Sequence, residues 1–114
     1  MITGIFHHRI GFPKGLVTDF GIIRLEYTNH AIKASKNDRY GLIMLPPTLN
    51  TAKAKAVEVE IIRNRLTKIV YRVDYSDKFD LAIVVTHDRK VKTVWLNCKD
   101  DNHPTLDESN YLKP

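Results

Sequence analysis

The sequence predicts an α+β protein with an N-terminal hairpin, one short helix and a four-stranded antiparallel meander. Four apolar segments follow one another between residues 57 and 97, one helix-like segment precedes them, and two β-prone segments flank a turn-rich loop near the start. At 114 residues the chain is most economically a single domain. We expect residues 1–27 to form the hairpin, 28–97 the helix and sheet, and 98–114 an acidic tail.

The predicted hairpin consists of two β-prone segments, residues 2–8 and 22–27. The loop between them contains glycine and proline at residues 11–15, as turns do. Asp19 and Gly21 interrupt the second arm. A long N-terminal hairpin is the simplest arrangement of these segments.

The predicted helix covers residues 29–39. Thr28 and Asn29 are suitable N-cap residues, and no proline or glycine follows until Gly41. The segment makes about three turns at 3.6 residues per turn. Ala31 and Ala34 are small enough to approach a sheet closely. The cations expected on the opposite side are Lys33, Lys36 and Arg39.

The meander follows from the alternation of side chains along each strand. In the first strand we expect Val57, Val59 and Ile61 on one face, opposite two glutamates. In the second strand one face carries Thr67, Ile69, Tyr71 and Val73, and the other carries Lys68, Val70, Arg72 and Asp74. Residues 81–85 are apolar on both faces, which predicts a central strand covered on both sides, with a helix as the covering element. Residues 91–97 alternate again and form the last strand.

Composition and charge favour an acidic partner in a reducing compartment. The net charge is +5, residues 27–56 hold five cations against one acid, and the final stretch from Asp100 holds four acids against one cation. No apolar run approaches the ~20 residues of a membrane span. His7 and His8 interrupt the segment where a secretory signal would be apolar, so we expect a cytoplasmic protein. The single cysteine excludes an intrachain disulfide and a cysteine-rich zinc site, and we expect no metal or other cofactor.

Two short segments of the helix region, NHAIKA at residues 29–34 and DRYG at residues 38–41, resemble a known family. They are similar to the HA-x-x-[RK]-A … R helix of small RelE-like toxins and related metal-independent ribonucleases, the barnase–EndoU–colicin–RelE group. The resemblance covers roughly residues 27–97, and Lys33 stands where arginine is commoner in the family. It implies a helix before a four-stranded antiparallel sheet that cleaves RNA on its face. The chain also resembles small phage and mobile-element proteins in size.

RNA cleavage without a metal requires a base, an acid and fixed cations at the phosphate. We expect His30 at the helix start to act as base or acid, with Lys33 one turn away and Arg72 on the sheet. His103 would be the second acid–base partner if the tail folds back. His7 and His8 are alternatives to His103, and His30 has the alternative of a partly buried helix residue bonded to backbone.

The predicted phosphate-binding cations extend from the helix to the second strand. They are Lys36, Arg39, Arg63, Arg65 and Lys68. Trp95 would stack on an unpaired base, with a place in the core as the alternative. Surface solubility explains the cations equally well.

The tail contains Asp100, Asp101, His103 and Asp107, which have metal-ligand chemistry but no recognisable ligand spacing. A solvated loop is therefore expected. Thr105 and Glu108 match a capping box, which predicts a helical turn near Tyr111.

Three functions are open at this point. The first is an RNA-binding protein with RelE-like fold and endoribonuclease activity, for which a host protein or an antitoxin is a candidate partner. The second is a non-catalytic binding module that inhibits a host protein or binds nucleic acid. The third is an oligomeric structural protein, because open sheet edges favour pairing.

Overall fold

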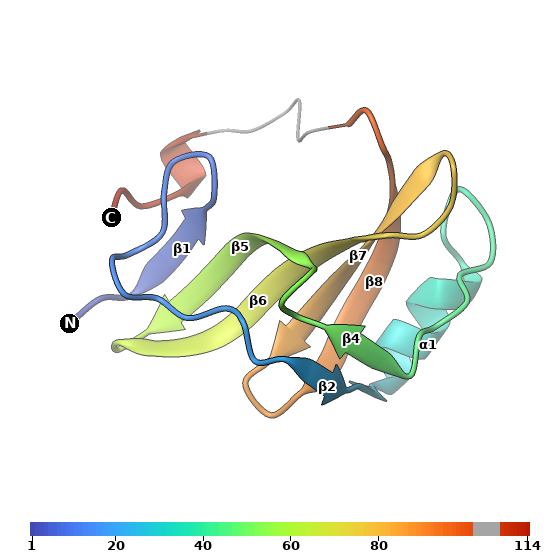
Figure 1. The fold of residues 1–114 in the computed structure, drawn as a ribbon, viewed down its shortest axis with the longest axis horizontal. Coiled ribbons are helices and arrows are strands. Elements are labelled where there is room, and N and C mark those ends of the chain that lie inside the picture. The colour runs from blue at the N-terminus through green and yellow to red at the C-terminus, as the bar shows by residue number, and fades with distance from the viewer. Residues whose placement is uncertain (102–107) are drawn as a thin grey trace.

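The computed structural model describes residues 1–101 and 108–114 and has an α+β fold (Figure 1). The elements in chain order are β1 (Gly4–His7), β2 (Ile22–Arg24), β3 (Glu26–Tyr27), α1 (Asn29–Lys36), β4 (Thr48–Asn50), β5 (Lys55–Ile62), β6 (Arg65–Asp74), β7 (Phe79–Thr86), β8 (Lys90–Cys98) and the 3₁₀ turn η1 (Glu108–Asn110). A six-stranded sheet has the order β1-β5-β6-β7-β8-β3, and β2 and β4 form a separate pair. All neighbours are antiparallel except β3 and β8.

The α+β class and the antiparallel meander are confirmed, whereas the prediction of four strands is wrong. The meander is β5 to β8, and β1 and β3 extend it at its two edges. These added strands are short and come from the N-terminal segments.

The predicted N-terminal hairpin does not form. Each of its segments pairs with a distant strand: β1 with β5, β2 with β4, and β3 with β8. This distribution lets Phe6, Ile23 and Leu25 all reach one hydrophobic core. A two-stranded hairpin standing alone would leave one of its faces in water, so burial favours the dispersed pairing.

Helix α1 begins as predicted but ends three residues early. The Thr28 hydroxyl accepts a hydrogen bond from the Ala31 backbone N–H at 3.2 Å and caps the helix. Asn37 takes the C-cap position, and the Asp38 carboxylate accepts from the Leu96 backbone N–H at 3.2 Å. This bond draws the chain toward β8 and ends the helix. Ala31 is fully buried, so α1 packs closely along β8 as expected.

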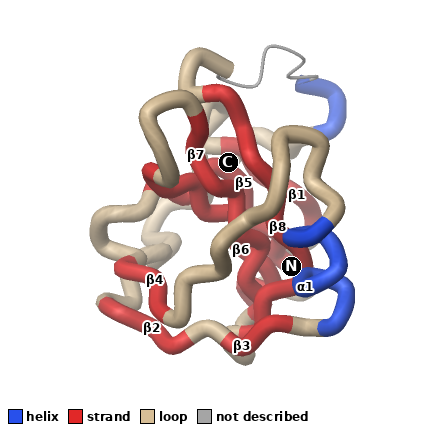
Figure 2. The backbone as a smooth tube through the Cα atoms, turned by 90° about the vertical axis from the view of Figure 1, so that its right-hand side faces the viewer, coloured by secondary structure: helices blue, strands red, loops and turns tan. Residues whose placement is uncertain are grey.

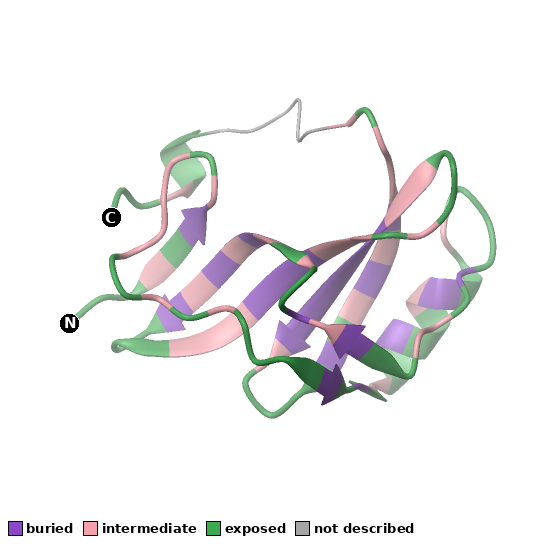
Figure 3. Ribbon diagram, viewed as in Figure 1, coloured by how far each residue is buried: buried purple, intermediate pink, exposed green. Residues whose placement is uncertain are grey.

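The sheet has an inner face, which packs on the main core, and an outer face. The main core lies between the sheet, α1 and the β2–β4 pair. Figure 2 shows that α1 and the β2–β4 pair lie at different places beside the sheet. Buried and partly buried residues alternate along β5, whereas β7 is buried through its central residues (Figure 3). On the outer face β7 is covered by a small cluster of Val57, Val70, Val84 and Trp95 rather than by a helix.

Val57 lies on the outer face, although the alternation placed it with Val59 and Ile61. The pairing of β5 with β6 shifts register between Ala56 and Glu58, which is a β-bulge. One extra residue in a strand reverses the face of every residue before it. A bulge therefore accounts for the wrong prediction.

The end of the chain returns to β1, near the N-terminus (Figure 1). The Leu112 backbone N–H donates to the Ile5 carbonyl at 2.8 Å, and the Tyr111 hydroxyl donates to Glu58 Oε1 at 2.9 Å. The helical turn predicted from Thr105 and Glu108 corresponds to η1, although Thr105 lies outside the described residues. Within the described ranges, no helix has the length and apolar character that crossing a membrane requires.

Candidate nucleic-acid interface

The structure does not bring the predicted catalytic residues together. His30 and Lys33 are exposed on α1, which packs along β8. Arg72 lies on β6, two strands away, and points to the outer face with Val70. Neighbouring strands are about 4.8 Å apart, so the two sites are separated by about 10 Å of sheet. His103 lies outside the described residues.

Arg72 is occupied by structural contacts. Its Nε donates to Asp80 Oδ2 at 2.7 Å, Nη2 donates to the Cys98 carbonyl at 2.8 Å, and Nη1 donates to the Asp101 carbonyl. Only 11% of the side chain is exposed. Each of the three guanidinium nitrogens is bonded within the protein, so Arg72 fixes the end of β8 and the residues after it to the sheet.

Other outer-face cations are also paired with acids. Lys99 forms ion pairs with Asp74 and, at 2.9 Å, with Asp80, and Lys68 pairs with Glu60 at 3.2 Å. Burial opposes ionisation of Asp80, but hydrogen bonds from Lys99 and Arg72 outweigh it and lower the pKa of this carboxyl. These pairs reduce the positive field that a polyanion would meet on the outer face.

Trp95 is half-buried, packs against the outer-face valine cluster and lines a hollow together with Arg39. Its Nε1–H donates to Asn97 Oδ1 at 3.2 Å. Lys36 and Arg39 are exposed near the C-terminal end of α1. The Arg39 guanidinium lies 4.6 Å from the centre of the Tyr40 ring. These residues lie on or near α1 and β8, whereas Arg63 and Arg65 lie at the β5–β6 turn. The structure therefore places the predicted phosphate-binding cations at two separate sites.

A different surface gathers cations at one end of the sheet. The β5–β6 and β7–β8 turns lie at this end, because antiparallel strands place alternate turns together. Two adjoining hollows of about 370 and 750 Å³ share Leu66, Thr67 and His87. We call them the turn-end groove. It is lined by Met1, Phe20, Ile23, Ile62, Arg63, Arg65, Leu66, Thr67, Lys68, Ile69, Tyr71, Val85, Thr86, His87 and Arg89.

The lining of the turn-end groove contains basic residues but no aspartate or glutamate. Arg63, Arg65 and Arg89 are exposed, and none of them takes part in an ion pair found among the described residues. Lys68 borders the groove but is paired with Glu60. Three guanidinium groups are thus available to an anion here.

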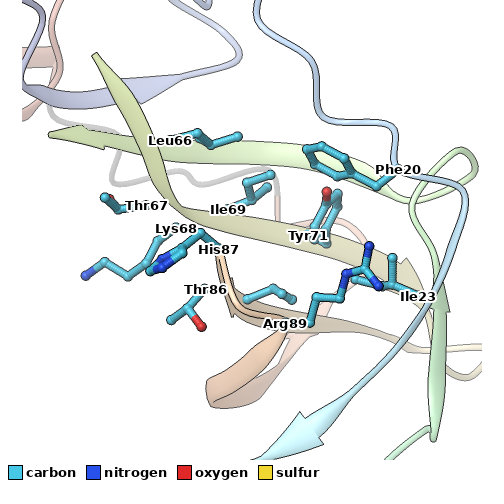
Figure 4. A pocket seen from close by; sticks show the side chains of 11 residues that line it. Phe20, Ile23, Leu66, Thr67, Lys68, Ile69, Tyr71, Thr86, His87 and Arg89 are labelled. Atoms are coloured by element: carbon cyan, nitrogen blue, oxygen red, sulfur yellow. The ribbon is translucent and has the colours of Figure 1, made fainter. Parts of the chain in front are cut away.

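The floor of the groove is apolar and fixed. Ile69 and Val85 are buried on the inner face, and the buried Tyr71 lies between Phe20 and Arg89 in the view of Figure 4. The Tyr71 hydroxyl donates to the Thr18 carbonyl at 2.6 Å, and burial raises the pKa of this phenol to about 12. The floor therefore supplies contact area rather than a titrating group at neutral pH.

Two of the three arginines have unusual backbone conformations. Arg63 has φ 50° and Arg89 has φ 66°, both in the left-handed region. Arg63 and Asn64 form a two-residue hairpin turn with positive φ at both positions, which normally contains asparagine or glycine. Strained residues of this kind concentrate at functional sites.

Some of this site was predicted from the sequence and some was missed. Arg63 and Arg65 were expected to bind phosphate and do lie together in the groove. Arg89, His87 and Phe20 were not expected. The meander itself contained a signal for residues 87–89, because alternate turns of an antiparallel meander share one end of the sheet. No pattern in the sequence marked Phe20.

No family model, curated protein or solved structure was found to match this chain. In the described part of the chain, no group of three or more His, Cys, Asp or Glu side chains is arranged to hold a metal ion. His103 and Asp107 of the tail lie outside that part. The RelE-like relationship stays a prediction from residues 29–41 and the order of elements.

Proposed function

We propose that this protein binds RNA along the turn-end groove and does not cleave it. The observation that carries the proposal is the set of three arginines, outside the ion pairs found among the described residues, along two adjoining hollows. Arginine binds phosphate oxygens with two parallel hydrogen bonds. Two carboxylates border the groove, but Glu60 is bonded to Thr67 and Lys68, and Asp88 is bonded to Thr86 and Lys90. The order of α1 followed by the β5–β8 meander supports a RelE-like type for this RNA-binding protein.

Binding is favoured over cleavage by the positions of the histidines. A metal-independent ribonuclease needs both a base and an acid at one phosphate. His87 is the only imidazole that lines the groove among the described residues, and His30 lies on α1 beside β8. The groove therefore contains the cations for phosphate binding and one of the two proton-transfer groups.

Two triple variants of the full chain test the proposal. Arg63, Arg65 and Arg89 are changed to glutamine in one, and Lys33, Lys36 and Arg39 of α1 are changed to glutamine in the control. Both lose three charges, so net charge cannot explain a difference between them. Fluorescence anisotropy with a labelled RNA oligonucleotide measures affinity over a range of salt concentrations, and a denaturing gel with EDTA measures cleavage.

We expect the groove variant to lose at least about tenfold in affinity, with its salt slope reduced by about 2, because single-stranded RNA releases about 0.7 counterions per phosphate contact. The helix control should change the affinity by less than about threefold, and the RNA should stay intact. Equal losses in the two variants would mean that RNA binds through net charge alone. Absence of binding by the unchanged protein, or cleaved RNA, would also contradict the proposal.

A further inference from the structure

Phe20 is a large aromatic side chain left half in water at the mouth of the turn-end groove. Its exposed fraction is 48%, although the neighbouring Ile23 and Tyr71 are buried. Burying such a ring is normally favourable by about 25 cal/mol per Å² of apolar surface. Beside Arg89, this exposed ring offers an apolar surface to a ligand that enters the hollow.

Phe20 is exposed although the backbone on both sides of it is fixed by hydrogen bonds. Its backbone N–H donates to the Thr51 hydroxyl at 2.7 Å, and the Thr51 hydroxyl donates to the Gly21 carbonyl at 2.6 Å. On the other side, the Thr18 carbonyl accepts from the buried Tyr71 hydroxyl. Gly21 has φ +69°, which glycine adopts without strain, and it turns the chain immediately after Phe20. Both ends of the segment are thus fixed to buried residues.

The hollow under Phe20 suits a flat ring. It has a volume of about 370 Å³, near the lower limit of small-molecule pockets, and its floor is formed by Ile69 and Val85. Phe20 lies on one side of Tyr71, and Arg89 lies on the other (Figure 4). Planar guanidinium groups and aromatic rings are the side chains on which unpaired RNA bases stack.

The arginines extend along the groove from this hollow. Arg89 borders the hollow itself, and Arg63 and Arg65 line the adjoining one. A strand whose base enters beside Phe20 would carry its next phosphates toward the latter pair. A base in a duplex is already paired and stacked and cannot enter such a hollow without opening.

We propose that the hollow beside Phe20 holds one unpaired nucleobase, so that the ligand of the groove is single-stranded RNA rather than duplex. This inference rests on the proposed function. Phe20 supplies the stacking surface, Arg89 borders the base and its phosphate, and Arg63 and Arg65 hold the following phosphates.

Three RNA probes of equal length separate base binding from backbone binding: an unstructured uridine-rich strand, the same sequence in a duplex, and a strand with abasic positions. The variants are Phe20→Leu, which removes the ring, and Phe20→Trp, which restores an aromatic surface. Ile22→Ala is the control, because Ile22 is 71% exposed on β2 and does not line the groove. Thermal melting followed by circular dichroism checks that each variant is folded.

We expect the single strand to bind at least about tenfold more tightly than the duplex or the abasic strand. Phe20→Leu should lose about 5- to 30-fold on the single strand, within the range for one stacked base, and little on the abasic strand. Phe20→Trp and Ile22→Ala should stay within about threefold of the unchanged protein. Equal affinity for all probes, or an unchanged Phe20→Leu, would overturn base insertion while leaving RNA binding intact. No binding of any probe would overturn the proposed function as well.

Discussion

Arg63 and Arg89 occupy turn positions at which the backbone conformation disfavours an arginine. A left-handed conformation costs a residue other than glycine about 1–2 kcal/mol, and asparagine less because its side chain bonds locally. Both side chains line the turn-end groove. We interpret the two strained positions as stability given up for the placement of two guanidinium groups.

Replacing Arg63 with asparagine should therefore stabilise the fold and weaken RNA binding at the same time. We expect the free energy of unfolding in urea to rise by about 0.5–1 kcal/mol, because asparagine tolerates positive φ in a two-residue hairpin turn. Arg65→Asn is the control, since Arg65 lies in β6 and has no positive φ. A less stable Arg63→Asn protein, or an equal gain in the control, would show that residue 63 is not strained.

Single residues were predicted from the sequence when their partners are close in the chain, and missed when their partners are distant. Thr28 was predicted as an N-cap from its type and position, and the structure confirms it. Phe20 was missed because its importance comes from Thr51 and Tyr71, which lie more than 30 residues away in the chain. Local patterns reveal local bonds, and they do not reveal a residue positioned by distant partners.

Among the elements, strand β6 contributes functional side chains to both faces of the sheet. Its inner face supplies Ile69 and Tyr71 to the groove floor, and its outer face supplies Arg72, which binds the chain after β8. The Arg72 side chain was predicted to position a phosphate, but its donors hold Asp80 and two backbone carbonyls. Removing the Arg72 side chain should therefore reduce the stability of the fold more than it reduces RNA affinity.

Replacing Arg72 with methionine should destabilise the protein far more than replacing Lys68 with methionine. Arg72→Met leaves Asp80 and two carbonyls without this partner at a site that is mostly buried, and breaking such a pair costs about 3 kcal/mol. Lys68 and Glu60 are 29% and 25% exposed, so their pair should contribute less than about 1 kcal/mol. Urea unfolding measures both. Similar losses in the two variants would contradict a structural role specific to Arg72.

Element types were predicted better than their partners. The alternation in residues 57–97 identified the four central strands, because one buried face is enough to fix a period of two. It could not identify the bulge at Val57 or the partners of β1, β2 and β3. Those partners are set by which pairing buries Phe6, Ile23 and Leu25 in one core, and this depends on the whole chain.

At the scale of the whole molecule, three tyrosines connect segments that are distant in sequence. The Tyr27 hydroxyl donates to the Pro46 carbonyl, and the Tyr71 hydroxyl donates to the Thr18 carbonyl. The Tyr111 hydroxyl donates to the Glu58 carboxylate. Burial is the main cause that raises the pKa of each phenol to about 12. They hold the N-terminal segments and the chain end around the sheet, and the fixed groove floor depends on one of them.

The sheet also separates two electrostatic environments. On the outer face Lys68, Arg72 and Lys99 are paired with acids, whereas the turn-end groove contains three arginines outside the ion pairs found in the described part of the chain. The net charge of +5 does not reveal this difference. A polyanion is steered toward the part of the surface where positive charge is not already compensated.

The most direct test of this account is a titration of the ¹⁵N-labelled protein with an unstructured RNA oligonucleotide, followed by amide chemical shifts in NMR spectra. We predict that the largest shifts fall on residues 19–23, 63–69 and 85–90, the three segments that supply most of the lining of the turn-end groove, with small shifts on α1 and on the outer-face residues of β8. Shifts centred on α1 around His30 and Lys33, or on the outer face around Trp95, with the groove unchanged, would contradict it.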